Sequence, residues 1–402
     1  MWKWTQINHL RLIILDCDSL KQEYIDFPYH QYLPDIEIVK INPQSQDQNI
    51  EIKYFMEDIL KDMRCQSYET ILISGNMSYL KEIMTVHIGT LLIGHIQQKD
   101  LKYMPDFVID SIDLLADVLL GQNKGYSGEV LAFENKKGSL LSCQTEIVAD
   151  DGKRYLTELY FGGRYYPEKH QYLLDDPLSF MILKFKHVYV DIMDTFFDEA
   201  IIEIRKKEII DALTYIPPKP QDIEKKRFQR FLSLKLERNA QDGLMLKDLL
   251  SCQCDFSQKG NDLAERRQTV KGVFRVNGDV KGKNIILIDD VFSSGSTMLE
   301  AMKTLYEAGA NKVIALAIAV SQMTESPLTY QKLVCSHCQE PMELVYYRKT
   351  HKLLFGCPHY SSHPDQKSIM SLRLGLFCLK KKNRLYYENY EYDEYGVPII
   401  YS

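Results

Sequence analysis

The sequence predicts a multidomain α/β protein, and three observations support this fold class. Short apolar runs typical of buried strands alternate with helical patterns in residues 1–122 and again in residues 188–330. Such alternation is typical of parallel sheets covered by helices. The 402 residues are enough for about two to four domains. Apolar residues make up 45% of the chain and charged residues 26%, a mixture that indicates a globular fold and excludes wholesale disorder.

The first predicted domain spans residues 1–122. Four short apolar runs predict its buried strands, at residues 11–15, 70–74, 90–93 and 107–109. Residues 54–63 and 111–120 have the apolar spacing of helices. The stretch that follows, residues 121–128, is rich in glycine and polar residues and predicts a linker.

The second predicted domain spans residues 123–330. Polar and apolar residues alternate in three segments near its start, residues 128–135, 140–148 and 153–161. Residues 150–153 carry a turn signal between the last two segments. We therefore expect a small antiparallel β-rich hood in residues 123–187, ahead of an α/β core in residues 188–330.

A phosphate site is predicted in residues 284–310. Residues 284–288 predict a buried strand, and two acids, Asp289 and Asp290, close it. A loop of small residues that opens a helix directs backbone N–H groups and the positive end of the helix dipole at one point, which suits a phosphate monoester. The predicted phosphate ligands are the loop residues Ser293, Ser294, Gly295, Ser296 and Thr297. The two acids suit ribose hydroxyls or a hydrated Mg²⁺.

This segment resembles the phosphoribosyl-pyrophosphate (PRPP) signature of type I phosphoribosyltransferases. In that signature an apolar strand, two acids, a Thr/Ser-rich loop with a glycine and a helix ending in Gly-Ala follow one another. The resemblance implies transfer of a 5-phosphoribosyl group from PRPP to a nitrogenous base, with Mg²⁺ bound alongside PRPP. Asp289 and Asp290 are then the catalytic residues, which hold the ribose hydroxyls while C1 gains cationic character. The identity of the base is not encoded in any pattern we can interpret.

The segment before the signature extends the resemblance. Residues 259–274 resemble the corresponding stretch in the competence-associated (ComF-like) branch of the family. The resemblance implies a mobile lid from which Arg266, Arg267 and Lys271 meet the pyrophosphate.

Residues 211–218 resemble the strand and turn that supply the pyrophosphate loop, with Lys219 and Arg227 as candidate contacts. An alternative interpretation stays open beside the transferase. In it the chain is a non-catalytic regulator that binds PRPP or a nucleotide, with the first domain as a partner or ligand module.

The first domain carries a second resemblance. A predicted strand runs into the sequence Asp16-Cys17-Asp18, which resembles the first motif of the haloacid-dehalogenase-like (HAD) superfamily. The resemblance implies a nucleophile at Asp16 and an acid/base at Asp18. Residues 71–94 resemble the last motif of that family, but Asn76 stands where the motif carries a metal-binding Asp. Because a lost carboxylate weakens Mg²⁺ binding, we expect a degenerate HAD-like domain.

Cysteine and histidine gather in residues 331–365. Cys335 and Cys338 form a C-x₂-C pair, and Cys357 and His363 follow at a C-x₅-H spacing. Thiolates and imidazoles are the ligands that tetrahedral Zn²⁺ takes. Together with the intervening apolar segments the pattern resembles a zinc ribbon, which implies a structural zinc ion on these four residues.

The ribbon prediction includes a β-hairpin with strands at residues 345–347 and 353–355. His359 is the rival of His363 for the fourth zinc ligand. A ribbon of this kind can contact nucleic acid, although the acidic stretch Glu388–Glu394 in the tail (residues 366–402) disfavours it.

Composition also indicates which classes of partner and which cellular compartment suit the chain. The chain has 49 basic and 55 acidic residues, a net charge of −6, which argues against broad electrostatic binding of nucleic acid. No apolar run reaches the roughly 20 residues of a membrane helix, and the N-terminus lacks the pattern of a cleavable signal. Nine scattered cysteines do not suit a disulfide scaffold. We therefore expect a cytoplasmic protein without a membrane partner; its oligomeric state is not predicted.

Overall fold

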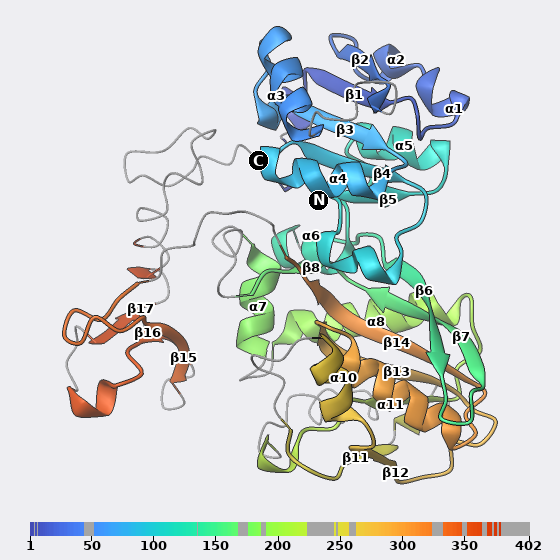
Figure 1. Ribbon diagram of the computed structural model, residues 1–402, viewed down its shortest axis with the longest axis vertical. Coiled ribbons are helices and arrows are strands. Elements are labelled where there is room, and N and C mark those ends of the chain that lie inside the picture. Colours follow the sequence, from blue (N-terminus) through green and yellow to red (C-terminus); the bar gives the residue numbers. More distant parts are fainter. Residues whose placement is uncertain are drawn as a thin grey trace. The chain divides into compact units, whose positions relative to one another are not determined.

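The computed structural model divides into two compact units (Figure 1). The first comprises Met1, Leu92–Tyr165 and Pro177–Gln322, and the second comprises Trp2–Leu91, Tyr166–Asp176 and Met323–Ser402. The residues that the structure describes are 1–3, 5, 7–43, 52–134, 136–167, 176–185, 190–222, 245–246, 248–256, 263–323, 333–347, 352–363, 368–371, 374–375 and 378. The α/β fold class predicted from the sequence is confirmed.

The N-terminal part of the chain forms a five-stranded sheet in the order β2-β1-β3-β4-β5. Its strands are β1 (Leu12–Asp16), β2 (Glu37–Ile41), β3 (Thr70–Ser74), β4 (Gly89–Ile93) and β5 (Phe107–Ile109). β1 is parallel to both β2 and β3, so the carboxyl ends of these strands share one edge of the sheet. Four of the five strands match the apolar runs predicted above. β2 was missed because only Ile41 in it is buried.

Helices surround this sheet. The longer ones are α3 (Ile52–Asp62), α4 (Met77–Ile83) and α5 (Ile112–Leu119), of which α3 and α5 confirm predictions. Shorter turns are α1 (Gln22–Ile25), α2 (Tyr29–Tyr32), η1 (Ile7–His9), η3 (Ser67–Glu69), η4 (Met84–Val86) and η5 (Gln98–Tyr103).

A seven-stranded sheet forms the centre of the first unit. Its order is β10-β9-β13-β14-β7-β6, and β8 pairs with β14 beside β7. The strands are β6 (Leu141–Val148), β7 (Arg154–Phe161), β8 (Arg164–Tyr165), β9 (Ala212–Tyr215), β10 (Met245–Leu246), β13 (Asn284–Phe292) and β14 (Lys312–Ser321). Every pairing except the β6–β7 hairpin is parallel.

Helices cover both faces of this sheet. α7 (Pro177–Phe185) and α8 (Asp191–Arg205) bury Ile182, Phe196 and Phe197 against alternate residues of β13 and β14. α11 (Ser296–Glu307) lies on the other face, with α10 (Leu263–Val270) beside it (Figure 1). A two-stranded sheet of β11 (Leu250–Cys252) and β12 (Phe274–Val276) completes the unit.

The predicted β-rich hood needs two corrections. Residues 128–135, predicted as a strand, lie mostly in the helix α6 (Ser127–Glu134). In this conformation Glu129, Val130 and Leu131 are all buried, which a strand with alternating faces does not allow. The hairpin of β6 and β7 does form around the predicted turn, but β7 pairs with β14. The hairpin therefore extends the main sheet and is not a separate β layer.

The C-terminal part of the chain forms a three-stranded antiparallel sheet. Its strands are β15 (Glu343–Tyr347), β16 (Lys352–Gly356) and β17 (Ile369–Ser371). β16 lies in the middle and pairs with both β15 and β17. The predicted hairpin is confirmed, whereas most of the predicted tail lies outside the described residues. No helix in the described part of the chain is long and apolar enough to cross a membrane.

Candidate functional sites

The predicted phosphate segment forms a strand, a loop and a helix. β13 extends to Phe292 and pairs with β14 up to that residue, so Asp289 and Asp290 lie inside the strand and do not follow it as the sequence had suggested. Asp290 is buried and Asp289 is half-buried. The pairing with β9 stops at Ile288, but the ladder with the ten-residue strand β14 continues past the acids to Phe292.

The two acids are held by their own backbone. The backbone N–H of Asp290 donates to Asp289 Oδ1 at 2.8 Å, and that of Val291 donates to Asp290 Oδ1 at 2.8 Å. Hydrogen bonds from N–H groups favour the ionised carboxylate. Both side chains are thereby fixed near the loop, where charged oxygens can accept hydrogen bonds from hydroxyl groups.

The loop itself is shaped by Gly295. This residue has φ +76° and is the N-cap of α11, and its carbonyl oxygen accepts the N–H of Leu299 at 2.8 Å. A Cβ at this position would lie 2.5 Å from Cζ of Phe292. The position therefore excludes any side chain, both because left-handed backbone is strained in other residues and because the aromatic ring is in the way.

Hydroxyl groups surround the N-terminus of α11. The Ser294 hydroxyl donates to Ser296 Oγ at 3.0 Å and accepts the Ser296 N–H at 3.3 Å. Ser293 is exposed, Thr297 is half-buried and Ser296 is buried. α11 has twelve residues, so its N-terminal N–H groups carry the partial positive charge of a full helix dipole. The structure thus brings the five predicted loop residues together at the N-terminus of a helix, a place where anions are commonly bound.

The predicted lid residues lie on and after α10. Arg266 is half-buried, and Arg267 and Lys271 are exposed. The N–H of Gly272 donates to the Glu300 carboxylate of α11 at 2.7 Å. The segment is therefore a helix followed by a turn that is hydrogen-bonded to α11. The mobile lid that the resemblance implies stays a prediction.

The predicted pyrophosphate strand is β9, which pairs in parallel with β13. The turn after β9 consequently lies at the same sheet edge as the phosphate loop. Lys219 in this turn donates to the backbone oxygen of Phe256, and its ammonium group lies 4.2 Å from the centre of the Phe256 ring. Arg227 lies outside the described residues.

A second cluster of polar groups lies where β1 and β3 end. Asp16 is fully buried, and its Oδ2 accepts hydrogen bonds from the hydroxyls of Ser19 at 2.5 Å and Ser74 at 2.6 Å. Its Oδ1 has no hydrogen-bond partner among the described residues. A buried carboxylate oxygen in this state is costly, and a cation or a ligand donor would satisfy it.

The neighbours of Asp16 have other partners. Asp18 accepts a hydrogen bond from the Asn42 amide at 2.9 Å. Asn76, which stands at the position of the expected metal-binding Asp, caps α4 by accepting the N–H of Ser78 at 3.0 Å. Its role as a helix cap gives a structural reason for the amide side chain.

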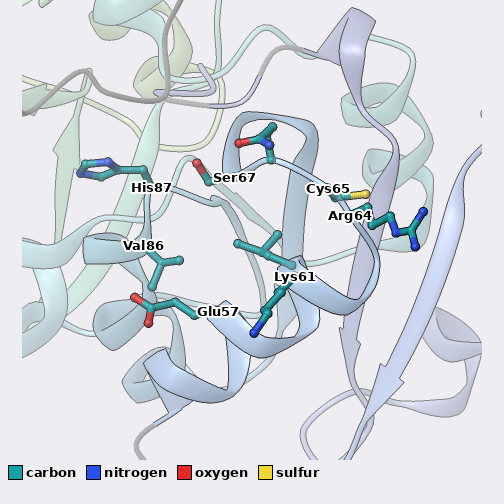
Figure 2. Close-up of a pocket in the computed structure, with 9 residues that line it drawn as sticks. Glu57, Lys61, Arg64, Cys65, Ser67, Val86 and His87 are labelled. Atoms are coloured by element: carbon teal, nitrogen blue, oxygen red, sulfur yellow. The ribbon is translucent and has the colours of Figure 1, made fainter.

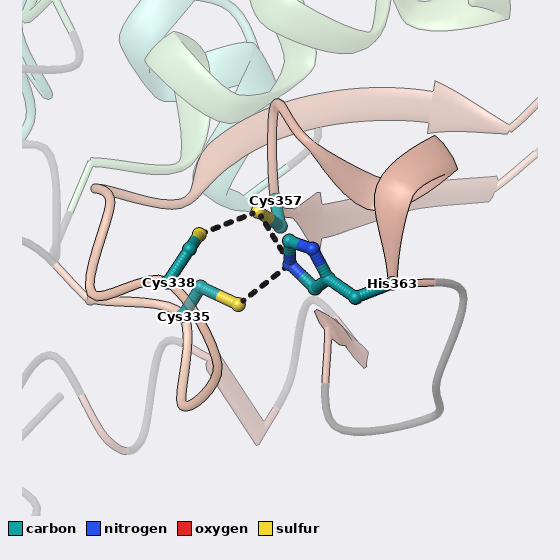
Figure 3. A group of neighbouring side chains, drawn as sticks. All are labelled: Cys335, Cys338, Cys357 and His363. Atoms are coloured by element: carbon teal, nitrogen blue, oxygen red, sulfur yellow. Dashed lines mark hydrogen bonds between the residues drawn. The ribbon is translucent and has the colours of Figure 1, made fainter.

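The four predicted zinc ligands come together (Figure 3). Their ligand atoms all lie within 4.8 Å of one another. His363 Nε2 is 3.4 Å from Cys335 Sγ and 3.3 Å from Cys357 Sγ, and the sulfurs of Cys338 and Cys357 are 3.4 Å apart. Donors around a tetrahedral zinc ion with bonds of about 2.3 Å lie somewhat under 4 Å apart, so the cluster fits zinc.

The surroundings of the cluster shift the pKa values of two of its thiols in opposite directions. Hydrogen bonding from the backbone of Cys338 lowers the pKa of Cys335 to about 6, and burial raises the pKa of Cys357 to about 11. His359 is not among the clustered ligands; its backbone N–H donates to Cys357 Sγ at 3.3 Å. The ring of His363, which the sequence left in competition with His359, is the one that faces the three sulfurs.

Sequence reasoning missed a buried ion cluster in the first unit. Arg164 donates to Glu129 through Nε at 2.8 Å and Nη2 at 2.9 Å, and through Nη1 to Asp106 at 2.7 Å. All three side chains are at most 5% exposed. The sequence offered one signal, an arginine inside the apolar segment after Phe161, but its partners are distant along the chain and carry no motif.

Comparison with known proteins agrees with the phosphate site. Residues 244–344 match the family model of the phosphoribosyl transferase domain. This range contains β13, the loop, α11 and the lid segment. It begins after β9 and ends in β15, so the match does not extend to the N-terminal sheet.

Several curated proteins are similar to parts of the chain. The ribose-phosphate pyrophosphokinase of Sulfurisphaera tokodaii is 30% identical over 95 residues, 24% of this chain and 31% of that protein. That of Pyrococcus furiosus is 50% identical over 42 residues, 10% of this chain and 15% of the relative. The transcriptional regulator GfcR 1 of Methanosarcina barkeri is 42% identical over 67 residues, 16% of this chain and 31% of the relative. The chain thus matches less than a third of the length of each of these relatives.

Proposed function

We propose that the chain binds PRPP at the loop between β13 and α11 and transfers its 5-phosphoribosyl group to a nitrogenous base. The supporting observation is the juxtaposition of two backbone-held acids with a glycine-shaped helix terminus. A phosphate at the loop leaves the attached sugar beside Asp289 and Asp290. The match to the phosphoribosyl transferase domain supports PRPP-related transfer independently of this geometry.

In the proposed mechanism the protein contributes position and charge. The N–H groups and hydroxyls of the loop hold the 5-phosphate, and this fixes the ribose relative to the acids. Asp289 and Asp290 accept hydrogen bonds from the ribose hydroxyls, and their negative charge stabilises the positive charge that develops at C1. A Mg²⁺ ion bound with PRPP would neutralise charge on the pyrophosphate. Carboxylate oxygens suit such an ion, and Asp289 and Asp290 are the residues placed to hold it or its water.

One structural feature favours the alternative, a regulator that binds PRPP or a nucleotide without turnover. The turn that follows α10 is attached to α11 by the Gly272–Glu300 hydrogen bond. A segment held in this way closes over a substrate only if that bond breaks. The transcriptional regulator among the similar proteins agrees with this possibility.

The experiment is to mix the full chain with PRPP, Mg²⁺ and a panel of nitrogenous bases, and to measure pyrophosphate release together with PRPP binding by calorimetry. Release that depends on one base supports the transferase. Binding without release for any base overturns the transferase and favours the regulator. Absence of binding overturns both proposals.

Variants show whether the response comes from this site. Asp289→Asn with Asp290→Asn should weaken PRPP binding by at least about tenfold, since charge-assisted hydrogen bonds are lost. Asp151→Asn, an exposed acid in the β6–β7 turn, is the matched control and should bind PRPP as the unmodified chain does.

A second candidate function concerns Asp16. We propose that the N-terminal sheet is a degenerate HAD-like domain in which Asp16 takes a divalent cation or a phosphorylated ligand. The buried oxygen without a partner supports this proposal. Because Asn76 lacks the second carboxylate, Mn²⁺ should bind weakly, and Asn76→Asp should tighten it while Asp16→Asn abolishes it. Equal Mn²⁺ binding by all three chains, measured by electron paramagnetic resonance, would rule the site out.

We also propose that the C-terminal sheet is a zinc ribbon. Its metal is held by Cys335, Cys338, Cys357 and His363. Four protein ligands leave no coordination position for a substrate, so the ion has a structural role.

A further inference from the structure

A pocket of about 540 Å³ lies beside α3 in the second unit (Figure 2). Residues of α3, η3, η4 and their flanking loops line it: Glu57, Leu60, Lys61, Arg64, Cys65, Gln66, Ser67, Val86 and His87. These segments precede β3 and β4, whereas Asp16 and Ser74 stand where β1 and β3 end. At about 3.3 Å per residue, the length of β3 separates the two places by roughly 13 Å. The pocket is therefore distinct from the Asp16 cluster.

The charged residues of the pocket are unevenly paired. Its one carboxylate, Glu57, forms an ion pair with Lys53 at 3.9 Å. Lys61 and Arg64 form no ion pair with any described residue, and both are exposed. The pocket lining thus carries two cationic groups and one carboxylate, an excess of positive charge that raises the local concentration of anions.

His87 adds neutral hydrogen-bonding groups. Burial, helped by the charge of Lys53, lowers the pKa of His87 to about 4. At neutral pH the ring is uncharged and carries one donor and one acceptor. Leu60 and Val86 add apolar surface to the same pocket, so it can contact both the polar and the apolar parts of a small molecule.

The backbone at the pocket is strained at two positions. Arg64 has φ +51° and His87 has φ +60°, values that cost side-chain-bearing residues roughly 1 kcal/mol. Arg64 follows α3, where a glycine is the unstrained choice, and the helix end is closed by the hydrogen bond from Cys65 N–H to Leu60 O at 3.0 Å. The helix end does not itself require the Arg64 guanidinium.

We propose that this pocket is a binding site for a small phosphate monoester that carries an apolar body. Lys61 meets the phosphate, for which an ammonium group is a usual partner. The guanidinium of Arg64, which points in another direction in Figure 2, adds positive charge at the edge of the pocket. His87 and Ser67 add neutral hydrogen bonds, and Leu60 and Val86 contact the body of the ligand. Glu57 suits a hydroxyl or amino group on that body.

The test uses the full chain with its histidines labelled with ¹³C for nuclear magnetic resonance. Adenosine 5′-monophosphate and inorganic phosphate are the two probes. We expect the monophosphate to shift the His87 signal saturably and at lower concentration than phosphate does. The readout reports on the His87 ring itself, and an unchanged midpoint in Asp289→Asn with Asp290→Asn separates it from nucleotide bound at the phosphate loop.

Variants separate binding from stability. Lys61→Gln should raise the midpoint of the His87 titration about tenfold, as expected for one charge-assisted hydrogen bond, whereas the exposed Lys21→Gln should not change it. Arg64→Gly should weaken binding and raise the melting temperature, because it removes both the cation and the strain. Absence of any His87 shift at millimolar probe, or equal midpoints in Lys61→Gln and Lys21→Gln, overturns the proposal. Equal affinity for both probes overturns the assignment to a monoester.

Discussion

Single residues fix the geometry of the phosphate loop, and Gly295 is the clearest example. The residue combines left-handed backbone with an aromatic ring 2.5 Å from its hypothetical Cβ. Strain and steric conflict therefore act together at the position where α11 begins. A side chain at position 295 would therefore change the shape of the loop.

Replacement of Gly295 by Ala should destabilise the chain by about 1–3 kcal/mol, of which roughly 1 kcal/mol is backbone strain. It should also reduce PRPP binding, since Phe292 or the loop must move. Urea unfolding and calorimetry measure the two effects. Gly282→Ala is the control: its φ is +70° with no atom within 4 Å of the added Cβ, so it carries the strain alone. Equal losses in both variants would refute a role for the Phe292 contact.

The buried Arg164 cluster predicts acid sensitivity. Burial by itself raises the pKa of Glu129, but Arg164 outweighs this and holds the pKa at about 2, below the ordinary 4.5. A carboxylate whose pKa is lower in the folded chain stabilises the fold at pH values above its unfolded-state pKa. This contribution is therefore complete above pH 4.5 and is lost as the pH falls toward 2.

Glu129→Gln should accordingly unfold more easily at pH 7, by up to about 3 kcal/mol, and its stability should fall less steeply between pH 4.5 and 2 than that of the unmodified chain. Urea unfolding at a series of pH values checks this. Parallel stability curves for the two proteins would show that Glu129 does not carry the pH dependence.

Elements built from local patterns are the ones that the sequence predicts well. β3 and β5 match their predicted ends, and α11 ends just before Gly309, at the Gly-Ala pair of the signature, where φ is +95°. The prediction of a strand where α6 forms was wrong because the apolar pattern of eight residues suits either a strand or a helix. The contact that favours the helix joins Glu129 to Arg164, which lies 35 positions away along the chain. The five loop residues and four zinc ligands could be found because each set is close in sequence. Asp106 and Arg164 could not, since their pairing depends on tertiary packing.

The three-stranded C-terminal sheet should depend on its metal. Its strands have three to five residues, too few to hold a hydrophobic core, and small domains of this kind commonly need a metal. His363→Ala should lose one equivalent of zinc and the hydrogen-exchange protection of β15 and β16, with β13 and β14 unaffected. His359→Ala should keep both. Zinc retained in His363→Ala would contradict the ligand assignment.

The whole molecule consists of two compact units, each with buried strands of its own. We expect their thermal transitions to respond to different ligands. PRPP with Mg²⁺ at a hundred times its dissociation constant should stabilise the first unit by about 2.7 kcal/mol, a rise of several degrees. A zinc chelator should lower only the transition of the second unit. Calorimetry of the full chain measures both shifts. A single transition that moves with both ligands would contradict this separation.

The pairing of β7 with β14 constrains how the protein is made. The register joins Leu159 to Ala315, so the ribosome must add about 150 residues, on the order of ten seconds of synthesis, before β7 meets its partner. Until then the hairpin presents an open strand edge to the cell, the kind of surface on which nascent chains associate. In a host that translates slowly, this strand edge stays exposed for longer. Chaperones should therefore have a larger effect on the yield of folded protein in such a host.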